Sequence, residues 1–261
     1  MPDRPRYLAA SLGLDLSDAA LAAQAAWLDL EPLYTRPLPT DRTGLVLTAQ
    51  GPHLRVPGGG EGLWPAGLVD WRIERGTGDA LVEALAPRAG EWVLDCTFGL
   101  GHDALVLARR GARVLALERR PALLFYSAAG VARHDPQAAR RIAVRCADHR
   151  EVLAALPDGA FPAVYLDPMF PPNRHRRGAT LEALRRCALL DPLDPATLRE
   201  AWRVASRVVV LRLPADAEAP TVLGLPPAQI VASRRVRFAA WHPAAHPPCD
   251  TTLLAVDQSD C

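Results

Sequence analysis

The stretch Glu91–Asp103, with the sequence EWVLDCTFGLGHD, is the segment from which we predict the fold. It begins with a short apolar, β-prone run that ends at Asp95, and a turn containing Gly99 and Gly101 then leads into a helical pattern over residues 104–110. Glycines at a strand–turn–helix junction let the backbone approach a ligand, and the first N–H groups of the helix point into the same space. The stretch therefore predicts a binding site for a nucleotide-like cofactor.

Two cofactors fit this turn. The segment GLGHDA at residues 99–104 also matches the dinucleotide fingerprint, in which Glu118 at the end of the next strand is the ribose-binding acid. A glycine turn that serves chain reversal alone is a third interpretation. Asp95 before the glycines and a second motif, DPMF at residues 167–170, favour S-adenosylmethionine (SAM), because a dehydrogenase has no need of that second motif.

The composition limits the protein class only broadly. The 261 residues, of which 49% are hydrophobic, suffice for one large α/β domain with or without a small extension. All 30 basic residues are arginines, which together with abundant Ala, Pro and Gly is typical of a GC-rich coding bias. The arginine count is therefore no evidence for a nucleic-acid partner, and the net charge of +1 argues neither way.

The cysteines and the hydropathy pattern indicate the compartment. The five cysteines are scattered, with no CxxC pair and no histidine at metal-ligand spacing. No apolar run reaches the roughly 18 residues of a membrane span, and the first residues lack a long apolar signal region. We predict a soluble, reduced, cytoplasmic protein without a metal site or a membrane contact.

The chain is expected to consist of two parts. Residues 1–75 are irregular in pattern, with a helical patch at 18–30 and a probable strand at 44–48, and they predict a small N-terminal subdomain that either holds substrate or only packs. In residues 76–261 strands alternate with helices, which predicts a doubly wound, mostly parallel sheet. The expected strands and helices of this part are strands 92–94, 112–117, 142–146, 162–166 and 206–211, a possible edge hairpin of 228–233 and 251–256, and helices 80–85, 104–110 and 121–131.

Four acids fall at the carboxyl ends of the expected strands, where ligands of such sheets bind: Asp95, Glu118, Asp148 and Asp167. At these places Glu118 can accept hydrogen bonds from both ribose hydroxyls, and Asp148 can accept one from the adenine amine. His149 beside Asp148 is either a further cofactor contact or a helix-cap residue. The position of all four acids at the ends of strands is stronger evidence for a cofactor site than any one of them alone.

The DPMF motif suits the methylation of an amine. A methyl group leaves a sulfonium by in-line attack, so the enzyme mainly has to orient the nucleophile. The lone pair of an exocyclic base amine is delocalised into the ring; Asp167 and the Pro168 carbonyl can accept its two hydrogens and turn the nitrogen toward the methyl group, while Phe170 stacks on the base. A plain Asp-Pro turn after a buried strand is the structural alternative.

A basic loop, PPNRHRRG at residues 171–178, follows this motif directly. Arg174, Arg176 and Arg177 can contact RNA phosphates there without reading the sequence, and Arg212 after the fifth strand can line the same cleft. A solvated charged surface is the alternative interpretation of such a run.

With these motifs the chain resembles the ribosomal RNA small subunit methyltransferase J family over roughly residues 44–220. The resemblance is densest in DCTFGLGHDALVLARRGARVLALERRP and VYLDPMFP, where the Met of DPMFP is characteristic of the family. It implies a seven-stranded class I SAM methyltransferase fold of Rossmann-like type with a small N-terminal extension. It also implies the family's activity, which is SAM-dependent methylation of the guanine N2 amine in 16S ribosomal RNA.

The resemblance further implies individual residue roles. LVLTAQGPHLRV at residues 45–56 looks like the family's N-terminal strand pair, and Asp167 would also sit against the target amine. A family lysine is here Leu211, and the family's acidic-and-serine pair is here Asp148-His149, so the departures concern substrate and adenine more than SAM itself. The cofactor-contacting positions implied by the match are His102, Asp103, Glu118, Arg119, Asp148, His149 and Asp167.

The sequence thus favours a SAM-dependent methyltransferase for guanine N2 in 16S ribosomal RNA, with the RNA or the small ribosomal subunit as partner. One alternative is methylation of another amine, such as adenine N6, a protein side chain or a small molecule. Another is a non-catalytic RNA-binding assembly factor. A nicotinamide-dependent dehydrogenase is a fourth hypothesis, and it leaves the DPMF motif unexplained.

Overall fold

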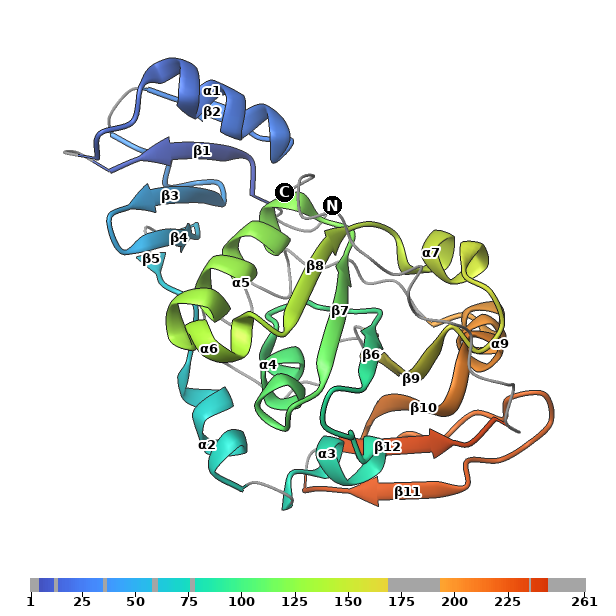
Figure 1. The fold of residues 1–261 in the computed structure, drawn as a ribbon. Helices are drawn as coiled ribbons and strands as arrows, with labels where there is room; N and C mark the ends of the chain where they lie inside the picture. Colours follow the sequence, from blue (N-terminus) through green and yellow to red (C-terminus); the bar gives the residue numbers. More distant parts are fainter. Residues whose placement is uncertain are drawn as a thin grey trace.

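The computed structural model describes residues 5–11, 14–34, 37–57, 61–75, 78–168, 193–234 and 236–243. These residues form two β-sheets, and helices cover both faces of the larger one (Figure 1). The strands of the larger sheet are β6 (Trp92–Asp95), β7 (Arg113–Glu118), β8 (Ile142–Cys146), β9 (Phe161–Leu166), β10 (Ala205–Pro214), β11 (Gln229–Ala232) and β12 (Val236–Trp241).

The larger sheet has seven strands in the order β11-β12-β10-β9-β6-β7-β8. Neighbouring strands pair in parallel except at β12, which is antiparallel to both β10 and β11. β6 pairs with β7 on one side and with β9 on the other, so the strand order reverses beside β6. This confirms the predicted doubly wound sheet, in which ligands bind at the point of reversal.

The helices lie in two layers around this sheet. Val93 packs in the same apolar cluster as Leu105 of α4, whereas its neighbour Leu94 packs with Leu198 of α9 on the opposite face. Side chains that alternate between two buried faces explain the continuous apolar character of the parallel strands. The helices of this part are α3 (Ala80–Leu85), α4 (His102–Arg109), α5 (Pro121–His134), α6 (Pro136–Ala139), α7 (His149–Ala155) and α9 (Pro195–Val204).

Local sequence signals explain where these helices begin. Asp79 is the N-cap of α3, and its carboxylate accepts hydrogen bonds from the backbone N–H groups of Leu81 and Val82. Pro121 occupies the first turn of α5, where its missing N–H costs nothing. None of the helices in the described ranges combines the length and the apolar character that a membrane crossing needs.

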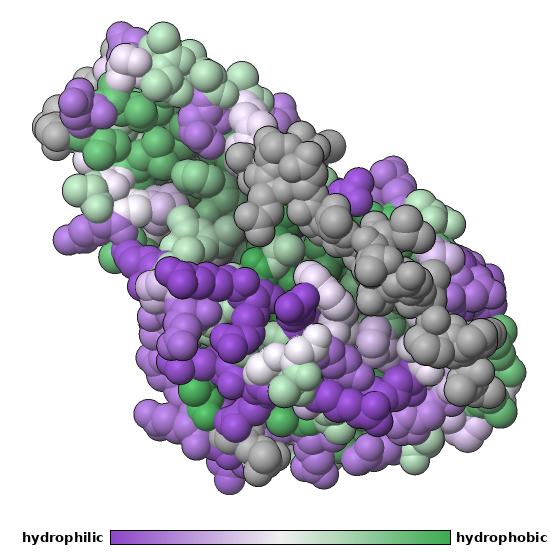
Figure 2. Space-filling view, viewed as in Figure 1, coloured by the Kyte–Doolittle hydropathy of each residue, from purple (hydrophilic) through white to green (hydrophobic). Residues whose placement is uncertain are grey.

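The N-terminal part is more ordered than its sequence indicated. It contains α1 (Asp18–Trp27) and a five-stranded sheet of order β2-β1-β3-β4-β5, which forms a lobe beside the larger body in Figure 2. The expected strand at 44–48 is β3, and the implied strand pair is the antiparallel hairpin of β3 and β4. The other strands were missed because they are short. The strands of this sheet are β1 (Tyr7–Ala10), β2 (Glu31–Leu33), β3 (Gly44–Thr48), β4 (Gly51–Arg55) and β5 (Glu61–Gly62).

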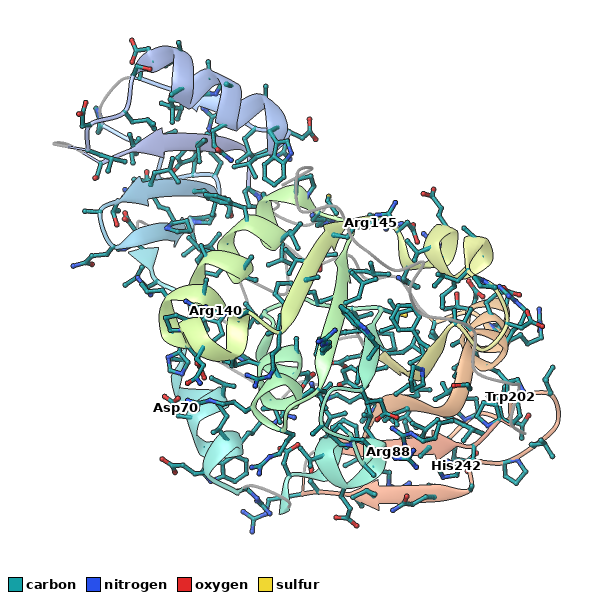
Figure 3. All side chains as sticks on the ribbon, viewed as in Figure 1. Asp70, Arg88, Arg140, Arg145, Trp202 and His242 are labelled. Atoms are coloured by element: carbon teal, nitrogen blue, oxygen red, sulfur yellow. The ribbon has the colours of Figure 1, made fainter. Side chains whose placement is uncertain are left out.

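A further helix, α2 (Gly67–Arg75), was not predicted from the sequence and connects this lobe to the body. Asp70 of α2 (labelled in Figure 3) lies 2.7 Å from Nε2 of His134 at the end of α5. Arg110 after α4 donates a hydrogen bond of 3.2 Å to the carbonyl of Ile73. The division of the chain at residue 75 stays a prediction, and these contacts favour a boundary before α2.

The C-terminal edge of the sheet differs from the expected hairpin of 228–233 and 251–256. β11 lies within the first of these runs, but its hairpin partner is β12, which was not predicted. Residues 251–256 lie outside the described residues. β12 was missed because Arg237 interrupts its apolar run and Ala239 and Ala240 have low β-propensity; its strand conformation comes from pairing with β10 and β11.

Candidate active site

The candidate site lies where β6 and β9 end side by side. Backbone N–H of Cys96 donates a hydrogen bond of 2.9 Å to the carbonyl of Tyr165. Backbone N–H of Asp167 donates one of 2.7 Å to Oγ1 of Thr97. The turn that follows β6 and the Asp-Pro turn that follows β9 are therefore fixed relative to each other, as the predicted common register of their acids requires.

The predicted glycine turn between β6 and α4 is present, and two of its glycines have left-handed backbone conformations. Gly99 and Gly101 have positive φ angles of 52° and 74°. A Cβ atom on Gly101 would lie 2.6 Å from the ring of Phe98 and 2.9 Å from Val131, whereas one on Gly99 would meet only the carbonyl of Thr97, at 3.7 Å. Gly101 is thus needed for packing, and Gly99 leaves its backbone open to a ligand.

Asp95 is fully buried at the centre of this site. Its Oδ1 accepts a hydrogen bond of 3.0 Å from the backbone N–H of Thr97, but its Oδ2 has no partner within the described part of the chain. Burial, reinforced by the nearby carboxylates of Asp103 and Asp167, raises the pKa of Asp95 from 3.8 to about 8. A buried polar atom without a partner marks a place where a bound molecule can make a hydrogen bond, and a bound cation there would favour the ionised carboxylate.

This pKa predicts how stability depends on pH. The folded protein holds a proton on Asp95 up to about pH 8, whereas the unfolded chain releases it near pH 3.8. The stabilisation from this proton is fully present below the unfolded pKa and is lost as the pH rises through the folded pKa. We expect Asp95→Asn to remove this loss. As the pH rises toward 8, the free energy of unfolding of the variant should therefore increase relative to that of wild type, by up to about 1.4 kcal/mol per pH unit.

Urea unfolding of both proteins between about pH 5 and pH 9 measures this difference. Asp103, Glu118 and Asp167 are present in both proteins, so the difference between the two curves reports the proton on Asp95 together with its coupling to these carboxylates. Parallel curves would show that Asp95 is already ionised in the folded protein at low pH.

Glu118 ends β7 next to the glycine turn. Its Oε2 accepts a hydrogen bond of 3.2 Å from the backbone N–H of Gly99, and its Oε1 accepts one of 3.0 Å from Arg120. Burial raises the pKa of this carboxyl, and the backbone hydrogen bonds oppose that rise. Each carboxylate oxygen can accept a second hydrogen bond, so this arrangement is compatible with the predicted ribose contact.

Asp148 lies at the end of β8 but is already paired. Its Oδ2 lies 2.9 Å from Nη1 of Arg119 and 2.6 Å from Nη2 of Arg150, and its Oδ1 accepts from the backbone N–H of Arg150 as the N-cap of α7. The hydrogen bonds from Arg150 hold the pKa of Asp148 below its usual range. The helix-cap role therefore belongs to Asp148; His149 is the first residue of α7, and the predicted adenine and cofactor contacts of both stay predictions.

His102 faces the N-terminal segment. Its Nε2 lies 2.9 Å from the carbonyl of Pro65, and its ring contacts the edge of Trp64 with centroids 4.7 Å apart. Burial lowers the pKa of His102 to about 4, so the ring is neutral at pH 7 and donates to Pro65. Trp64 was not predicted from the sequence. Its Nε1–H donates a hydrogen bond of 2.7 Å to the carbonyl of Leu100 and so fixes the glycine turn.

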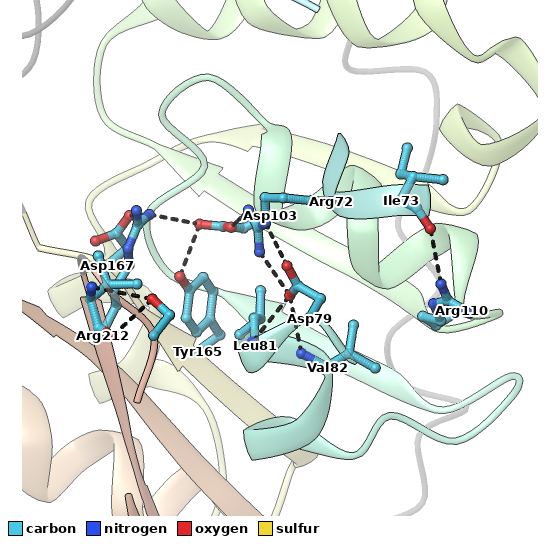
Figure 4. A network of polar contacts seen from close by, with 12 residues as sticks. Arg72, Ile73, Asp79, Leu81, Val82, Asp103, Arg110, Tyr165, Asp167 and Arg212 are labelled. Carbon is cyan, nitrogen blue, oxygen red and sulfur yellow. Dashed lines mark hydrogen bonds and ion pairs between the residues drawn. The ribbon is translucent and has the colours of Figure 1, made fainter. Parts of the chain in front are cut away.

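Asp103 is the centre of a network of charges (Figure 4). It is paired with Arg72 of α2, its Oδ2 accepts a hydrogen bond of 2.9 Å from the hydroxyl of Tyr165, and Oδ2 lies 3.4 Å from Nη1 of Arg212. Nη1 of Arg212 also lies 2.6 Å from Oδ2 of Asp167. Burial alone would raise the pKa of Asp103, but the two arginines hold it below its usual range. Arg72 was not predicted, since nothing in its local sequence marks it.

Several predicted residues cannot be placed in this geometry. Phe170 and the arginines of the basic loop, Arg174, Arg176 and Arg177, lie outside the described residues, so their roles stay predictions. Pro168 directly follows Asp167 in the described part.

Comparison with known proteins identifies the family. Residues 66–243 match the family model described as "Putative SAM-dependent methyltransferase". The chain is 35% identical over 243 residues to ribosomal RNA small subunit methyltransferase J from Alkalilimnicola ehrlichii, covering 84% of this chain and 89% of the relative. The chain belongs to the ribosomal RNA small subunit methyltransferase J family.

Further comparisons agree with this membership. The methyltransferase J of Halorhodospira halophila is 35% identical over 241 residues, covering 84% of this chain and 88% of the relative. A solved structure of a SAM-dependent methyltransferase from Neisseria gonorrhoeae has a TM-score of 0.66 at 25% identity and covers 90% of this chain and 95% of that one. The protein is therefore a SAM-dependent methyltransferase, and the dehydrogenase hypothesis is wrong.

The geometry fits the cofactor of the methyltransferase J family. Three groups lie around the glycine turn: the backbone at Gly99, the carboxylate of Glu118, and Oδ2 of Asp95, which has no partner in the described ranges. A molecule with ribose hydroxyls and an ammonium group can donate hydrogen bonds to such acids. The acids and the open turn thus suit SAM, whose amino acid and ribose parts carry these donors.

Proposed function

We propose that this protein transfers a methyl group from SAM to the exocyclic N2 amine of a guanine in small-subunit ribosomal RNA. The names of its relatives support the RNA class, and the resemblance noted above supports the guanine amine. The observation that carries the proposal is Asp167. Arg212 occupies its Oδ2, while no hydrogen bond or ion pair to its Oδ1 is found within the described residues.

The proposal assigns each acid a role. Asp95 and the turn at Gly99 and Gly101 hold the amino acid part of SAM, while Glu118 binds the ribose. Asp148 borders the adenine. Its Oδ1 already accepts two hydrogen bonds from Arg150, and its Oδ2 accepts one each from Arg119 and Arg150, so the adenine amine would have to displace one of them. The resemblance adds His102, Asp103 and His149 as border positions of the same pocket.

Asp167 and Pro168 orient the nucleophile. Bound SAM supplies an electrophilic methyl group. Oδ1 of Asp167 and the carbonyl of Pro168 accept the two hydrogens of the amine, so that the nitrogen lone pair turns toward the methyl carbon. A carboxylate next to the nitrogen also stabilises the positive charge that develops as the C–N bond forms and the C–S bond breaks. Asp167 Oδ1 then lies in position to take the proton that the methylated nitrogen loses.

Loss and rescue of one modified nucleoside tests this function. We expect N2-methylguanosine at one site of 16S ribosomal RNA to disappear from cells that lack the gene. It should return with the wild-type protein but not with Asp167→Asn. Mass spectrometry of nuclease digests measures the nucleoside. Unchanged RNA in the deletion cells would contradict the proposed substrate. Loss of a different methylated amine would identify that amine as the substrate instead.

An in vitro assay shows whether free RNA or the assembled subunit is the substrate. Purified protein is incubated with methyl-labelled SAM and either deproteinised 16S RNA or small subunits from the deletion cells. Label in the subunits alone would make the assembled particle the partner. The cytoplasmic location stays a prediction, and either substrate is consistent with it.

A further inference from the structure

An alternating chain of charges leads from the N-terminal side of the site to Asp167 (Figure 4). Arg72 binds Asp79 with two hydrogen bonds, Nε to Oδ2 at 2.8 Å and Nη2 to Oδ1 at 3.1 Å, and also pairs with Asp103. Arg212 joins Asp103 to Asp167 through the same Nη1 atom. The five residues come from α2, α4, β10, the cap of α3 and the end of β9, so only the folded chain brings them together.

This chain is largely removed from water. The side chains of Asp79, Asp103 and Arg72 are 7%, 13% and 16% exposed, and those of Asp167 and Arg212 are 26% and 28% exposed. Buried charges persist only where each is paired, because an unpaired ion keeps the full penalty of desolvation. Three carboxylates alternate with two guanidinium groups, so each guanidinium is shared between two carboxylates.

We propose that Arg212 is a positioning residue for methyl transfer, which holds Oδ2 of Asp167 so that Oδ1 faces the target amine. Asp103 and Arg72 fix Arg212 in turn. This inference rests on the proposed methylation of an amine and gives Arg212 a role other than the RNA-phosphate contact predicted from its sequence position. Arg212 is bound through Nη1 to two partly buried carboxylates, so this N–H group is directed at Asp103 and Asp167 rather than at a phosphate.

Two further observations support the inference. Asp103 accepts a hydrogen bond from the hydroxyl of Tyr165, so the carboxylate that pairs with Arg212 is itself fixed in position. Burial raises the pKa of Asp167, and the charge of Arg212 opposes that rise. An ionised carboxylate only accepts hydrogen bonds, whereas a protonated carboxyl could donate one toward the amine. Arg212 therefore both orients the carboxylate and favours its charged form.

Arg212→Met tests the role by separating rate from binding. We expect kcat for methyl transfer to fall about 100-fold, because a misplaced reacting group costs about that much. The Kd for SAM and the KM for the RNA substrate should change by less than about threefold, since the variant keeps those contacts. Arg212→Lys should recover part of the rate, because an ammonium can pair with one carboxylate oxygen but lacks the planar fork.

Arg207→Met is the matched control. Arg207 lies on the same strand, β10, and its Nε and Nη2 lie 2.8 Å from the carboxylate of Glu91 at the opposite end of the sheet. This variant also loses an ion pair and is expected to lower stability while leaving kcat within about twofold of wild type. A KM increase with unchanged kcat in Arg212→Met would overturn the proposal and restore the RNA contact.

A double-mutant cycle and a spectroscopic measurement complete the test. In an Asp167→Asn background, Arg212→Met should lower kcat by less than about threefold, because the group it positions is already lost. If the losses of kcat in the two single variants instead multiplied in the double variant, the two residues would act independently, and the proposal would be contradicted.

Carboxyl-carbon NMR on protein labelled at aspartate, with Asp167 assigned from Asp167→Asn, reports the pKa of Asp167 without any RNA. Arg212→Met should raise this pKa, because the variant removes the guanidinium that opposes the effect of burial and leaves Asp95, Asp103 and Arg72 as the nearby charges. An unchanged pKa would overturn the inference. A wild-type protein that leaves 16S RNA unmethylated would refute the proposed substrate, and the NMR result would still decide the role of Arg212.

Discussion

Asp167→Asn is expected to lower kcat for methyl transfer about 1,000-fold while the Kd for SAM changes less than about threefold. Asparagine has the same shape but carries one oxygen and one NH2 group. Arg212 can only donate, so it selects the oxygen of the amide and turns the NH2 group toward the target amine. Two donors then face each other, and the amine loses its acceptor.

Single-turnover methyl transfer to small ribosomal subunits measures this rate, and titration calorimetry measures SAM binding. Asp167→Ala serves as a second variant, because it removes both groups and should lose a similar amount of rate. Full activity of either variant would show that another group orients the amine. A large loss of SAM affinity would make Asp167 a cofactor contact rather than a catalytic residue.

Trp64→Ala is expected to reduce the free energy of unfolding by about 3–5 kcal/mol, which is typical of truncating a buried aromatic side chain. Trp64 is 4% exposed, and its ring occupies space that only a glycine at position 130 of α5 leaves open, since a Cβ there would lie 2.2 Å from the ring. Its Nε1–H also satisfies the carbonyl of Leu100 in the glycine turn. The variant should therefore also bind SAM at least about tenfold more weakly.

Urea unfolding and calorimetry measure the two effects. Trp64→Phe fills most of the space but leaves the Leu100 carbonyl without its donor, so we expect a smaller loss of about 1–2 kcal/mol. Trp27→Ala on α1 is the control for loss of an indole, because Trp27 is 51% exposed and its removal should change stability by less than about 0.5 kcal/mol. Equal losses at positions 27 and 64 would contradict the packing argument.

Much of the α/β domain was predictable because its signals are local. The strands ending at Asp95 and Glu118 and the helix beginning at Pro121 agree with the structure to within a few residues. The cap at Asp79 and the positive φ angles of the glycine turn also follow from residue type. Parallel strands that are buried on both faces leave a continuous apolar run, which is easily recognised in a sequence.

The missed elements depend on pairing or on partners far along the chain. β1 has only four residues and is a strand because β2 and β3 flank it. β12 contains an arginine and two alanines, and it is a strand because it lies between β10 and β11. α2 is held by contacts with α4 and α5 that its own sequence does not announce.

By itself, the sequence determined the strand–turn–helix junction at residues 91–103, the acids at the strand ends and the resemblance that named the methyltransferase J family. Each of these depends on residue types a few positions apart. The tertiary structure alone placed Arg72 and Arg212 between Asp79, Asp103 and Asp167, and Trp64 behind the glycine turn. Arg72 and Arg212 are 140 positions apart in a chain with 30 arginines, and only burial in the folded protein makes their pairing with these carboxylates obligatory.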